Sequence, residues 1–383
     1  MSDSPTAVPS SHVEIYAQTL RHLFRPIVPF LDDPTVSEVL INAPDVVYVE
    51  RAGRLHRTEA TFSGPAALMA AARNLAEYVG RPIDGGQHSV DGRLPDGSRV
   101  HVLFPPASRQ GVCVSIRKFQ REVFDLDSLV ARNTMTAAAA EFLCIAVRAR
   151  KNIVVAGGTG TGKTSLLNAL STAIPADERV VVIEDSSELQ LRQPHTLYLE
   201  SQPEQPGGRA AVTIRDLFVD SLRMRPDRIL VGEVRRGEAL DLIQSMLSGH
   251  TGSLTTVHAS TPRDAAVRLE TLCLMSDVGL PQPVARTQVA SAVNLVVQLN
   301  RFPDGRRRVV KVSEVVGLTG PAGDYSVCDL FTYRAAAGGG DGTLVPTGAS
   351  PTFTAEVFDA GLDGMMKETL GLFTRPPSST AGG

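Results

Sequence analysis

The residues with the clearest chemical meaning are 157–164, which read GGTGTGKT. They match G-x-x-x-x-G-K-[ST], the loop that cradles nucleotide phosphates, and they stand between an apolar run and a helical stretch, as that loop requires. Glycines let backbone N–H groups turn toward phosphate oxygens, and the helix N-terminus adds partial positive charge. We expect Lys163 to reach the β- and γ-phosphates and the Thr164 hydroxyl to sit on Mg²⁺. The predicted ATP contacts in this segment are Gly158, Thr159, Gly160, Thr161, Gly162, Lys163, Thr164 and Ser165.

An acidic segment, residues 184–188 with the sequence EDSSE, follows the apolar run 180–183. In a parallel sheet this segment would lie beside the phosphate loop, where a carboxylate could order Mg²⁺, its waters or the attacking water. We assign Glu184 to Mg²⁺, largely through water, together with Thr164. The competing interpretation is a cap, in which Asp185 or Ser186 begins a short helix. Spacing alone does not separate the two interpretations.

A second acidic strand end is formed by residues 228–233, RILVGE. It resembles a Walker B segment in which Gly232 replaces the usual Asp. Glu233 is therefore the candidate general base, polarising water for attack on the γ-phosphate. Nearby arginines either form surface ion pairs or neutralise phosphate charge from a neighbouring subunit, and the sequence leaves both readings open. These arginines are Arg223, Arg225, Arg235 and Arg236.

Two histidines flank the apolar run 254–257. His250 and His258 are eight residues apart, and no third ligand has a spacing suited to a metal site. We therefore expect no metal there. His258 either contacts the γ-phosphate or is an ordinary structural histidine.

The elements that must position these residues form an alternating pattern after residue 150. Short apolar runs separated by helical stretches indicate a mainly parallel α/β sheet. The runs are 153–156, 180–183, 229–231, 254–257, 293–299 and 309–316, of which the last two could be antiparallel edge strands. We expect a helix that has Asn133 as its N-cap and runs to about Arg150. Residues 335–350 are expected to form a loop, and residues 352–372 are expected to form a last helical element. Residues 374–383 are expected to be disordered.

The first 119 residues predict a smaller α+β unit. Its expected helices are 13–30 and 65–79, and its expected strands are 36–41, 46–50, 100–104 and 112–116. Residues 120–133 are typical of a linker. The predicted division is an N-terminal domain, 1–119, a linker, 120–133, a P-loop domain, 134–334, and a C-terminal extension, 335–383.

The composition restricts the class of protein further. The 38 Lys and Arg against 41 Asp and Glu give a net charge of -3, so the chain as a whole does not favour a polyanion. The run Arg306-Arg307-Arg308 is more typical of a solvated turn than of a nucleic-acid site. No apolar run predicts a membrane span, and residues 1–11 lack the features of a signal peptide. We expect a cytoplasmic protein without stable nucleic-acid binding, whose membrane contact goes through partners.

These segments, in this order, resemble the ATPases of type II and type IV secretion systems, and most closely the CpaF-like branch that serves tight-adherence pili. The resemblance spans about residues 30–334. It is carried by the runs LRMRPDRILVGEVR (222–235), SGHTGSLTTVH (248–258), DGRLPDGSRV (91–100) and SIRKF (115–119). Arg236 stands where the branch usually has Gly, a departure that leaves the catalytic residues in place.

The resemblance implies a RecA-like ATPase domain preceded by a PAS-like α+β domain that closes over the nucleotide, in a hexameric ring. Arg99 and Arg117 look like the N-terminal arginines that reach the phosphates, and Glu188 looks like the functionally important glutamate of the acidic box. The expected catalytic set is Glu233, Glu188, Lys163 and His258, acting on ATP with Mg²⁺.

The function implied is a motor for pilus assembly or protein secretion that acts on an inner-membrane platform protein. A conjugation-type ATPase for DNA transfer is the nearest alternative. A RecA-like nucleic-acid translocase is a further one, although no aromatic–basic stripe supports it. A scaffold without turnover would not need Lys163, Thr164, Glu188 and Glu233 together.

Overall fold

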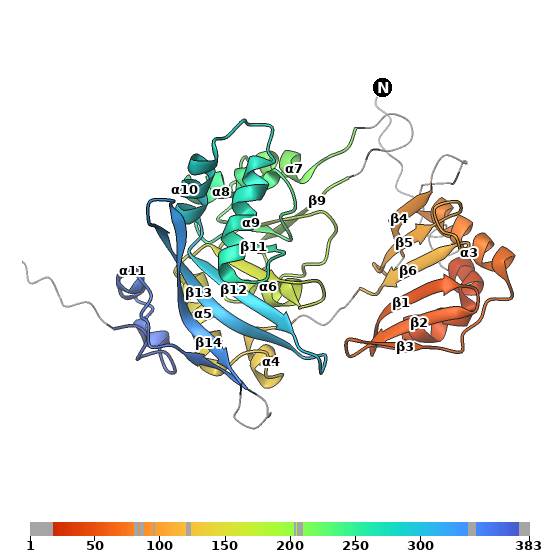
Figure 1. Ribbon diagram of the computed structural model, residues 1–383, viewed down its shortest axis with the longest axis horizontal. Helices are drawn as coiled ribbons and strands as arrows, with labels where there is room; N and C mark the ends of the chain where they lie inside the picture. Colours follow the sequence, from red (N-terminus) through yellow and green to blue (C-terminus); the bar gives the residue numbers. More distant parts are fainter. Residues whose placement is uncertain are drawn as a thin grey trace, which may run out of the picture. The chain divides into compact units, whose positions relative to one another are not determined.

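The computed structural model describes residues 18–79, 83, 88–94, 96–119, 124–202, 204, 210–335 and 342–374. These residues belong to two compact units, Met1–Glu122 and Val123–Gly383 (Figure 1). Each unit has its own sheet and its own core, so each is described by itself.

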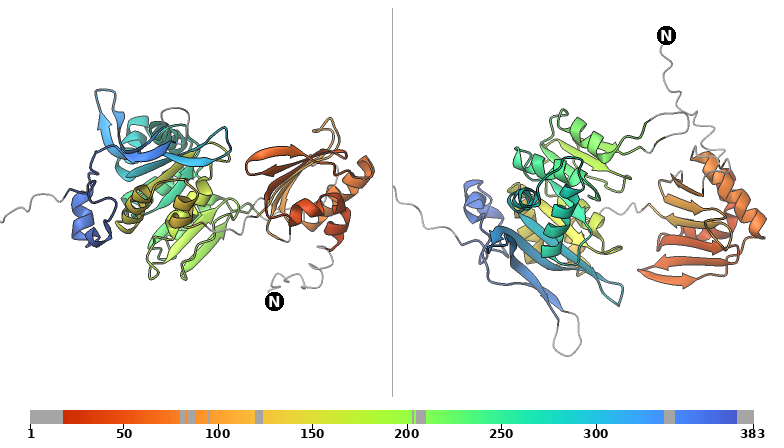
Figure 2. Two further views of the ribbon diagram at one scale, coloured as in Figure 1. Left: turned by 90° about the horizontal axis from the view of Figure 1, so that it is seen from below. Right: turned by 45° about the horizontal axis from the view of Figure 1, so that its top comes forward.

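The first unit is a six-stranded antiparallel sheet in the order β3-β2-β1-β6-β5-β4, with helices on one face (Figure 2). Alternate residues of β2, β5 and β6 are buried: Val100 and Val102 of β5, for instance, share a core with Leu75 of α3. The elements are η1 (Arg25–Ile27), α2 (Val28–Asp32), β1 (Val36–Ala43), β2 (Val46–Arg51), β3 (Arg54–Arg57), α3 (Pro65–Tyr78), β4 (Ser89–Arg93), β5 (Arg99–Leu103) and β6 (Cys113–Arg117).

The expected helix over 13–30 is not continuous. Residues 18–23 are helical, but η1 and α2 follow as separate short helices, each with a proline in its first turn. Pro26 and Pro29 lack the N–H that an uninterrupted helix would need, so the chain begins a new helix at each of them. Residues 13–17 of this prediction lie outside the described residues.

The stretch expected to be a linker contains helix α4 (Leu126–Ala131). Asp125 caps it: its side chain accepts the Ser128 N–H, while the Ser128 hydroxyl group accepts the Asp125 N–H. Leu126 and Leu129 are buried in the core of the second unit. Residues 120–123 lie outside the described residues.

The next helix, α5 (Ala137–Arg148), begins later than predicted. Its N-cap is Thr136, whose hydroxyl accepts the Ala139 N–H, and not Asn133. Asn133 instead has a positive φ of 56°, a backbone conformation that suits the turn between α4 and α5.

The second unit is built on a nine-stranded sheet in the order β15-β14-β13-β12-β7-β11-β10-β8-β9. The six strands from β12 to β9 in this order are parallel, as predicted, and β13, β14 and β15 extend the sheet antiparallel. The strands are β7 (Ile153–Gly157), β8 (Val180–Glu184), β9 (Thr196–Glu200), β10 (Arg228–Val231), β11 (Leu254–Val257), β12 (Leu295–Arg301), β13 (Arg307–Thr319), β14 (Asp324–Arg334) and β15 (Thr343–Pro346).

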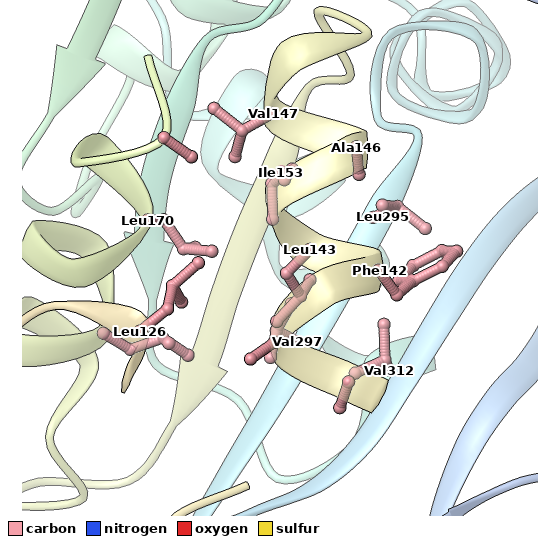
Figure 3. Packing of buried hydrophobic residues seen from close by; sticks show 14 of the residues in the cluster. Leu126, Phe142, Leu143, Ala146, Val147, Ile153, Leu170, Leu295, Val297 and Val312 are labelled. Atoms are coloured by element: carbon pink, nitrogen blue, oxygen red, sulfur yellow. The ribbon is translucent and has the colours of Figure 1, made fainter. Parts of the chain in front are cut away.

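Helices cover both faces of this sheet, so its central strands are buried throughout. On one face, Phe142, Leu143 and Ala146 of α5 pack over Ile153 and the neighbouring strands (Figure 3). The opposite face is covered by α8, α9 and α10. The remaining helices are α6 (Lys163–Ser171), α7 (Ile214–Ser221), α8 (Glu238–Leu247), α9 (Pro262–Leu274) and α10 (Gln282–Ala292).

The C-terminal segment departs from the prediction in two places. Strand β15 lies within the expected loop, and the expected helix over 352–372 is reduced to α11 (Thr354–Asp359) and η2 (Asp363–Met365). Carboxylates of the core bind this segment: Glu141 accepts the N–H groups of Lys367, Glu368 and Thr369. Its Phe373 ring stacks on Phe142, with centroids 5.6 Å apart, so the segment is part of the core. Residues 375–383, expected to be disordered, lie outside the described residues.

Candidate active site

The phosphate loop connects the end of β7 to the start of α6, in the predicted strand–loop–helix context. Gly160 and Gly162 have φ angles of +70° and +93°, which residues with a β-carbon rarely adopt. A β-carbon on Gly157 would lie 2.5 Å from the Thr161 hydroxyl oxygen and 2.9 Å from the Leu299 carbonyl oxygen. The loop therefore closes tightly enough to need glycine at all three positions.

Lys163 places a cation inside this loop. Its ammonium group donates to the Gly158 carbonyl oxygen at 3.1 Å, and its side chain is only 9% exposed. The Nζ atom also lies 3.4 Å from Nε2 of His258 and 3.9 Å from Oε1 of Glu233. A buried ammonium group that is bonded to the loop backbone is suited to binding an anion, so the loop fits the triphosphate predicted for it.

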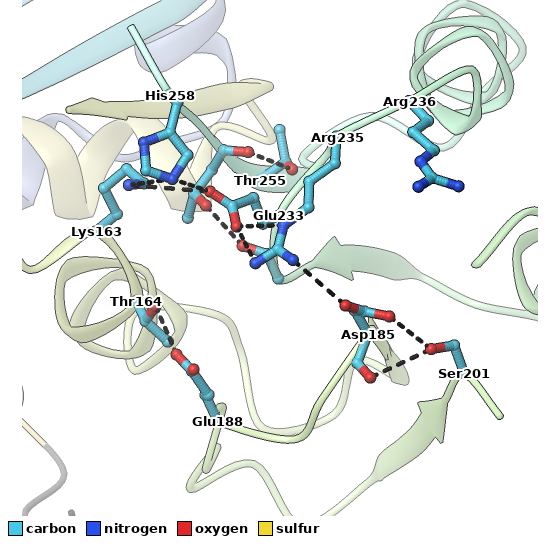
Figure 4. A network of polar contacts seen from close by, with 12 residues as sticks. Lys163, Thr164, Asp185, Glu188, Ser201, Glu233, Arg235, Arg236, Thr255 and His258 are labelled. Atoms are coloured by element: carbon cyan, nitrogen blue, oxygen red, sulfur yellow. Dashed lines mark hydrogen bonds and ion pairs between the residues drawn. The ribbon is translucent and has the colours of Figure 1, made fainter. Parts of the chain in front are cut away.

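Glu233 lies at the centre of the polar network (Figure 4). Its Oε2 accepts a hydrogen bond from Nε of Arg235 at 2.7 Å and forms an ion pair with Nη2 of the same side chain at 2.6 Å. Its Oε1 is buried and lies 2.8 Å from Nε2 of His258, but no well-directed hydrogen bond from the described residues reaches it. One oxygen of this carboxylate is therefore fixed by a guanidinium, while the other can still accept a proton.

His258 follows β11 directly, and its ring lies between Lys163 and Glu233. Burial lowers the pKa of His258, and the positive charge of Lys163 lowers it further. A neutral imidazole is therefore favoured at neutral pH. The structure brings three of the four predicted catalytic residues together, from segments 95 positions apart in the chain.

The fourth, Glu188, lies on the other side of the loop. Its Oε2 accepts a hydrogen bond from the Thr164 hydroxyl group at 3.1 Å. The acidic segment that carries Glu188 begins no helix, so the capping interpretation of Asp185 and Ser186 is wrong. Asp185 instead accepts the Ser201 hydroxyl group at 2.8 Å and lies 3.4 Å from Nη1 of Arg235.

Glu184 has a structural contact that the sequence did not predict. Its side chain is 4% exposed, and its Oε1 accepts the backbone N–H groups of Glu188 and Leu189 at 2.9 and 3.0 Å. Burial raises the pKa of Glu184 to about 7. The carboxylate in contact with Thr164 is thus Glu188, while Glu184 anchors the loop that holds it. Within the described part of the chain, no group of three or more His, Cys, Asp or Glu side chains is arranged to hold a metal ion.

Arg99 and Arg117 lie in the first unit, directly opposite each other in the pairing of β5 with β6. Arg117 also lies 3.9 Å from Oε1 of Glu38. The contact of both arginines with nucleotide remains a prediction. Arg236, the residue that departs from the family pattern, lies just before α8, where its backbone N–H donates to the Glu238 carboxylate. Figure 4 shows its side chain apart from the network around Glu233.

Comparison with known proteins places this site in a family. Residues 22–333 match the family model described as "Type II/IV secretion system protein". This match covers most of the chain. The chain belongs to the type II/IV secretion system protein family.

Individual relatives agree with this membership. The chain is 38% identical over 291 residues to "Putative conjugal transfer protein Rv3659c" of Mycobacterium tuberculosis, covering 74% of this chain and 82% of that protein. It is 35% identical to "Type IV secretion system protein PtlH" of Bordetella pertussis, covering 76% and 94%. The X-ray structure of the Legionella pneumophila ATPase DotB shares the fold, with 18% identity, coverage of 82% and 83%, and a TM-score of 0.52.

This secretion ATPase therefore combines an N-terminal domain with a RecA-like α/β domain. Among its described residues, no helix has the length and apolarity needed to cross a bilayer. The sequence singles out Arg235 but does not predict its partner Glu233, and it does not predict that Ser201 donates to Asp185. The only signal for Ser201 was its position just after β9, the edge strand that pairs with β8.

Proposed function

We propose that this secretion ATPase hydrolyses ATP at the loop 157–165, with Glu233 as the base that polarises water. One observation carries the proposal: the Glu233 carboxylate has a proton-accepting oxygen 3.9 Å from the ammonium of Lys163, the group that would hold the γ-phosphate. Arg235 fixes the other oxygen, so the carboxylate is already oriented before water arrives.

The remaining residues supply charge and position. Lys163 exchanges its bond to the Gly158 carbonyl oxygen for phosphate oxygens. Neutral His258 donates or accepts one hydrogen bond beside Glu233 without adding positive charge to that carboxylate. Mg²⁺, when bound, neutralises charge on the β- and γ-phosphates. Thr164 would hold it directly and Glu188 through water, which is ordinary for an ion that keeps several waters and few protein ligands.

At the level of the machine, we propose a homohexamer that acts at the inner face of the cytoplasmic membrane through a platform protein. The motifs quoted above support the tight-adherence pilus branch. The identity to a protein named as a putative conjugal transfer protein supports a second candidate, DNA transfer. In the first case an affinity-tagged chain should recover a polytopic membrane protein encoded beside pilin genes. In the second case it should recover a conjugation complex. A higher rate of hydrolysis in the presence of single-stranded DNA would instead favour a RecA-like nucleic-acid translocase.

The test of the site is a pair of variants assayed for phosphate release and for nucleotide binding. Lys163→Ala should abolish both, because the phosphates lose their cation. Glu233→Gln should still bind ATP but lose hydrolysis by roughly 100-fold or more, because an amide cannot take the proton. Unchanged turnover in Lys163→Ala would refute the loop as the site. Normal hydrolysis in Glu233→Gln would move the base to Glu188.

A further inference from the structure

The hairpin formed by β12 and β13 runs alongside the phosphate loop. Strand β12 pairs in parallel with β7, and Leu299 is in register with Gly157, where the loop begins. Strand β12 continues to Arg301, and β13 begins at Arg307. The turn end of the hairpin therefore extends past β7, level with the phosphate loop.

The side chains of two arginines of this hairpin lie beside loop glycines. A β-carbon on Gly160 would lie 3.3 Å from Nη1 of Arg301, and a β-carbon on Gly162 would lie 3.4 Å from Cδ of Arg307. Arg301 and Arg307 are also direct partners in the β12–β13 register, so they project from the same face of the hairpin. Two guanidinium side chains thus lie against the backbone that turns toward phosphate.

The opposite face of the hairpin is fixed by aromatic packing. Arg308, only 4% exposed, lies over the rings of Phe302 and Tyr333, at 5.3 and 5.7 Å from their centroids, and donates to the Tyr333 hydroxyl group. The two rings are themselves 5.2 Å apart. Since neighbouring strand residues point to opposite faces, burying Arg308 directs Arg307 toward the loop.

The sheet order decides which part of a nucleotide these arginines can reach. Strand β7 lies between β12 on one side and β11 on the other, followed by β10. His258 and Glu233 follow β11 and β10, so the hydrolytic residues are on the far side of the loop from Arg301 and Arg307. The glycines beside these arginines belong to the backbone that cradles the α- and β-phosphates.

We propose that Arg301 and Arg307 bind the α- and β-phosphate oxygens shared by ATP and ADP, and so set nucleotide affinity rather than the rate of hydrolysis. This inference rests on the proposed function, because it requires the triphosphate to occupy the loop 157–165. Guanidinium groups suit this role because they donate two parallel hydrogen bonds to a phosphate group.

The experiment measures affinity and turnover in the full-length protein. Arg301→Ala and Arg307→Ala are each titrated with fluorescent ADP and with a fluorescent, slowly hydrolysed ATP analogue, at one ionic strength. We expect each variant to lose about tenfold in affinity for both nucleotides alike. The KM for ATP should rise by a similar factor, while kcat changes far less. Arg301→Lys should recover part of the loss, because it restores the charge but not the paired donors.

Arg306→Ala is the matched control. Arg306 lies in the same turn and carries the same charge, but its Nε pairs with Asp304 at 3.2 Å and no loop glycine touches it among the described contacts. It should bind both nucleotides within about twofold of the unaltered protein. Equal losses in Arg306→Ala would overturn the proposal in favour of general electrostatic attraction.

Two other outcomes would also overturn it. Unchanged affinity in both arginine variants would show that the hairpin does not contact nucleotide. A loss confined to the ATP analogue, with a fall in kcat, would place the contact at the γ-phosphate. Lys163→Ala distinguishes failure of this inference from failure of the proposed function. Full nucleotide affinity in Lys163→Ala would refute the loop as the site. Loss of affinity in Lys163→Ala, with full affinity in Arg301→Ala and Arg307→Ala, would refute the inference alone. Unchanged thermal unfolding of each variant confirms that affinity, not folding, is measured.

Discussion

Replacing Glu184 by Gln should change how the stability of this protein depends on pH. Glu184 is buried, and its carboxyl group accepts two backbone N–H groups of the loop that carries Glu188. A glutamine can accept the same hydrogen bonds through its amide oxygen, but it cannot ionise. The substitution therefore removes the titration while keeping the loop contact.

The magnitude follows from the pKa of Glu184, which burial raises from 4.5 to about 7. Below pH 4.5 the carboxyl is protonated in the folded and the unfolded chain alike. Between pH 4.5 and 7 only the unfolded chain releases the proton, so rising pH lowers the free energy of unfolding. Above pH 7 the loss is complete, at about 3 kcal/mol, since each pKa unit is worth about 1.4 kcal/mol. The Gln variant avoids this loss.

Urea unfolding of both proteins at several pH values between 4.5 and 8, without nucleotide, measures the effect. The free energy of unfolding of Glu184→Gln, relative to that of the unaltered protein, should increase by about 3 kcal/mol across this range. Using the difference cancels the other titrating groups, provided they lie too far away to couple. A difference that stays constant with pH would refute the assignment of Glu184 as a buried loop anchor, and it would favour its predicted role as a charged carboxylate that faces Mg²⁺ through water.

Two further predictions concern His258 and Gly252. Because the pKa of His258 is lowered from 6.5, the rate of hydrolysis should fall only at acid pH, where the imidazolium would repel the ammonium group of Lys163. His258→Gln should change this acid limb of the pH–rate profile. Identical pH–rate profiles for the variant and the unaltered protein would contradict the prediction. Gly252 has a φ of +82°, and a β-carbon there would lie 1.8 Å from Nη1 of the fully buried Arg228. Gly252→Ala should therefore lower the free energy of unfolding, measured in urea, by about 3 kcal/mol or more. Gly249→Ala, at φ +108° with no atom near the added carbon, is the matched control and should cost about 1–2 kcal/mol; equal costs would show that Arg228 is not displaced.

Much of the second unit could be predicted because its signals are local. Buried parallel strands are short and apolar, and the loop glycines stand between a strand and a helix, so β7, β8, β10 and β11 were expected at nearly their observed positions. The helices with weaker local signals are predicted less well. The sequence predicts a linker where α4 lies, because α4 is only six residues long and its burial depends on α5 and α6.

The position of the loop glycines, Lys163 and Glu233 at one edge of the sheet could be predicted from the sequence alone, because their motifs are local and the carboxyl ends of parallel strands meet at one edge of a sheet. The different contacts of the two glutamates in the acidic segment depend on the folded chain. Glu184 and Glu188 are four positions apart and chemically alike, but one is buried against backbone N–H groups and the other reaches Thr164. Arg301 lies 141 positions after Gly160 in the chain, and only the pairing of β12 with β7 brings the two together. Burial and long-range contacts of this kind leave no periodic trace in a sequence, so they are visible only once the chain has folded.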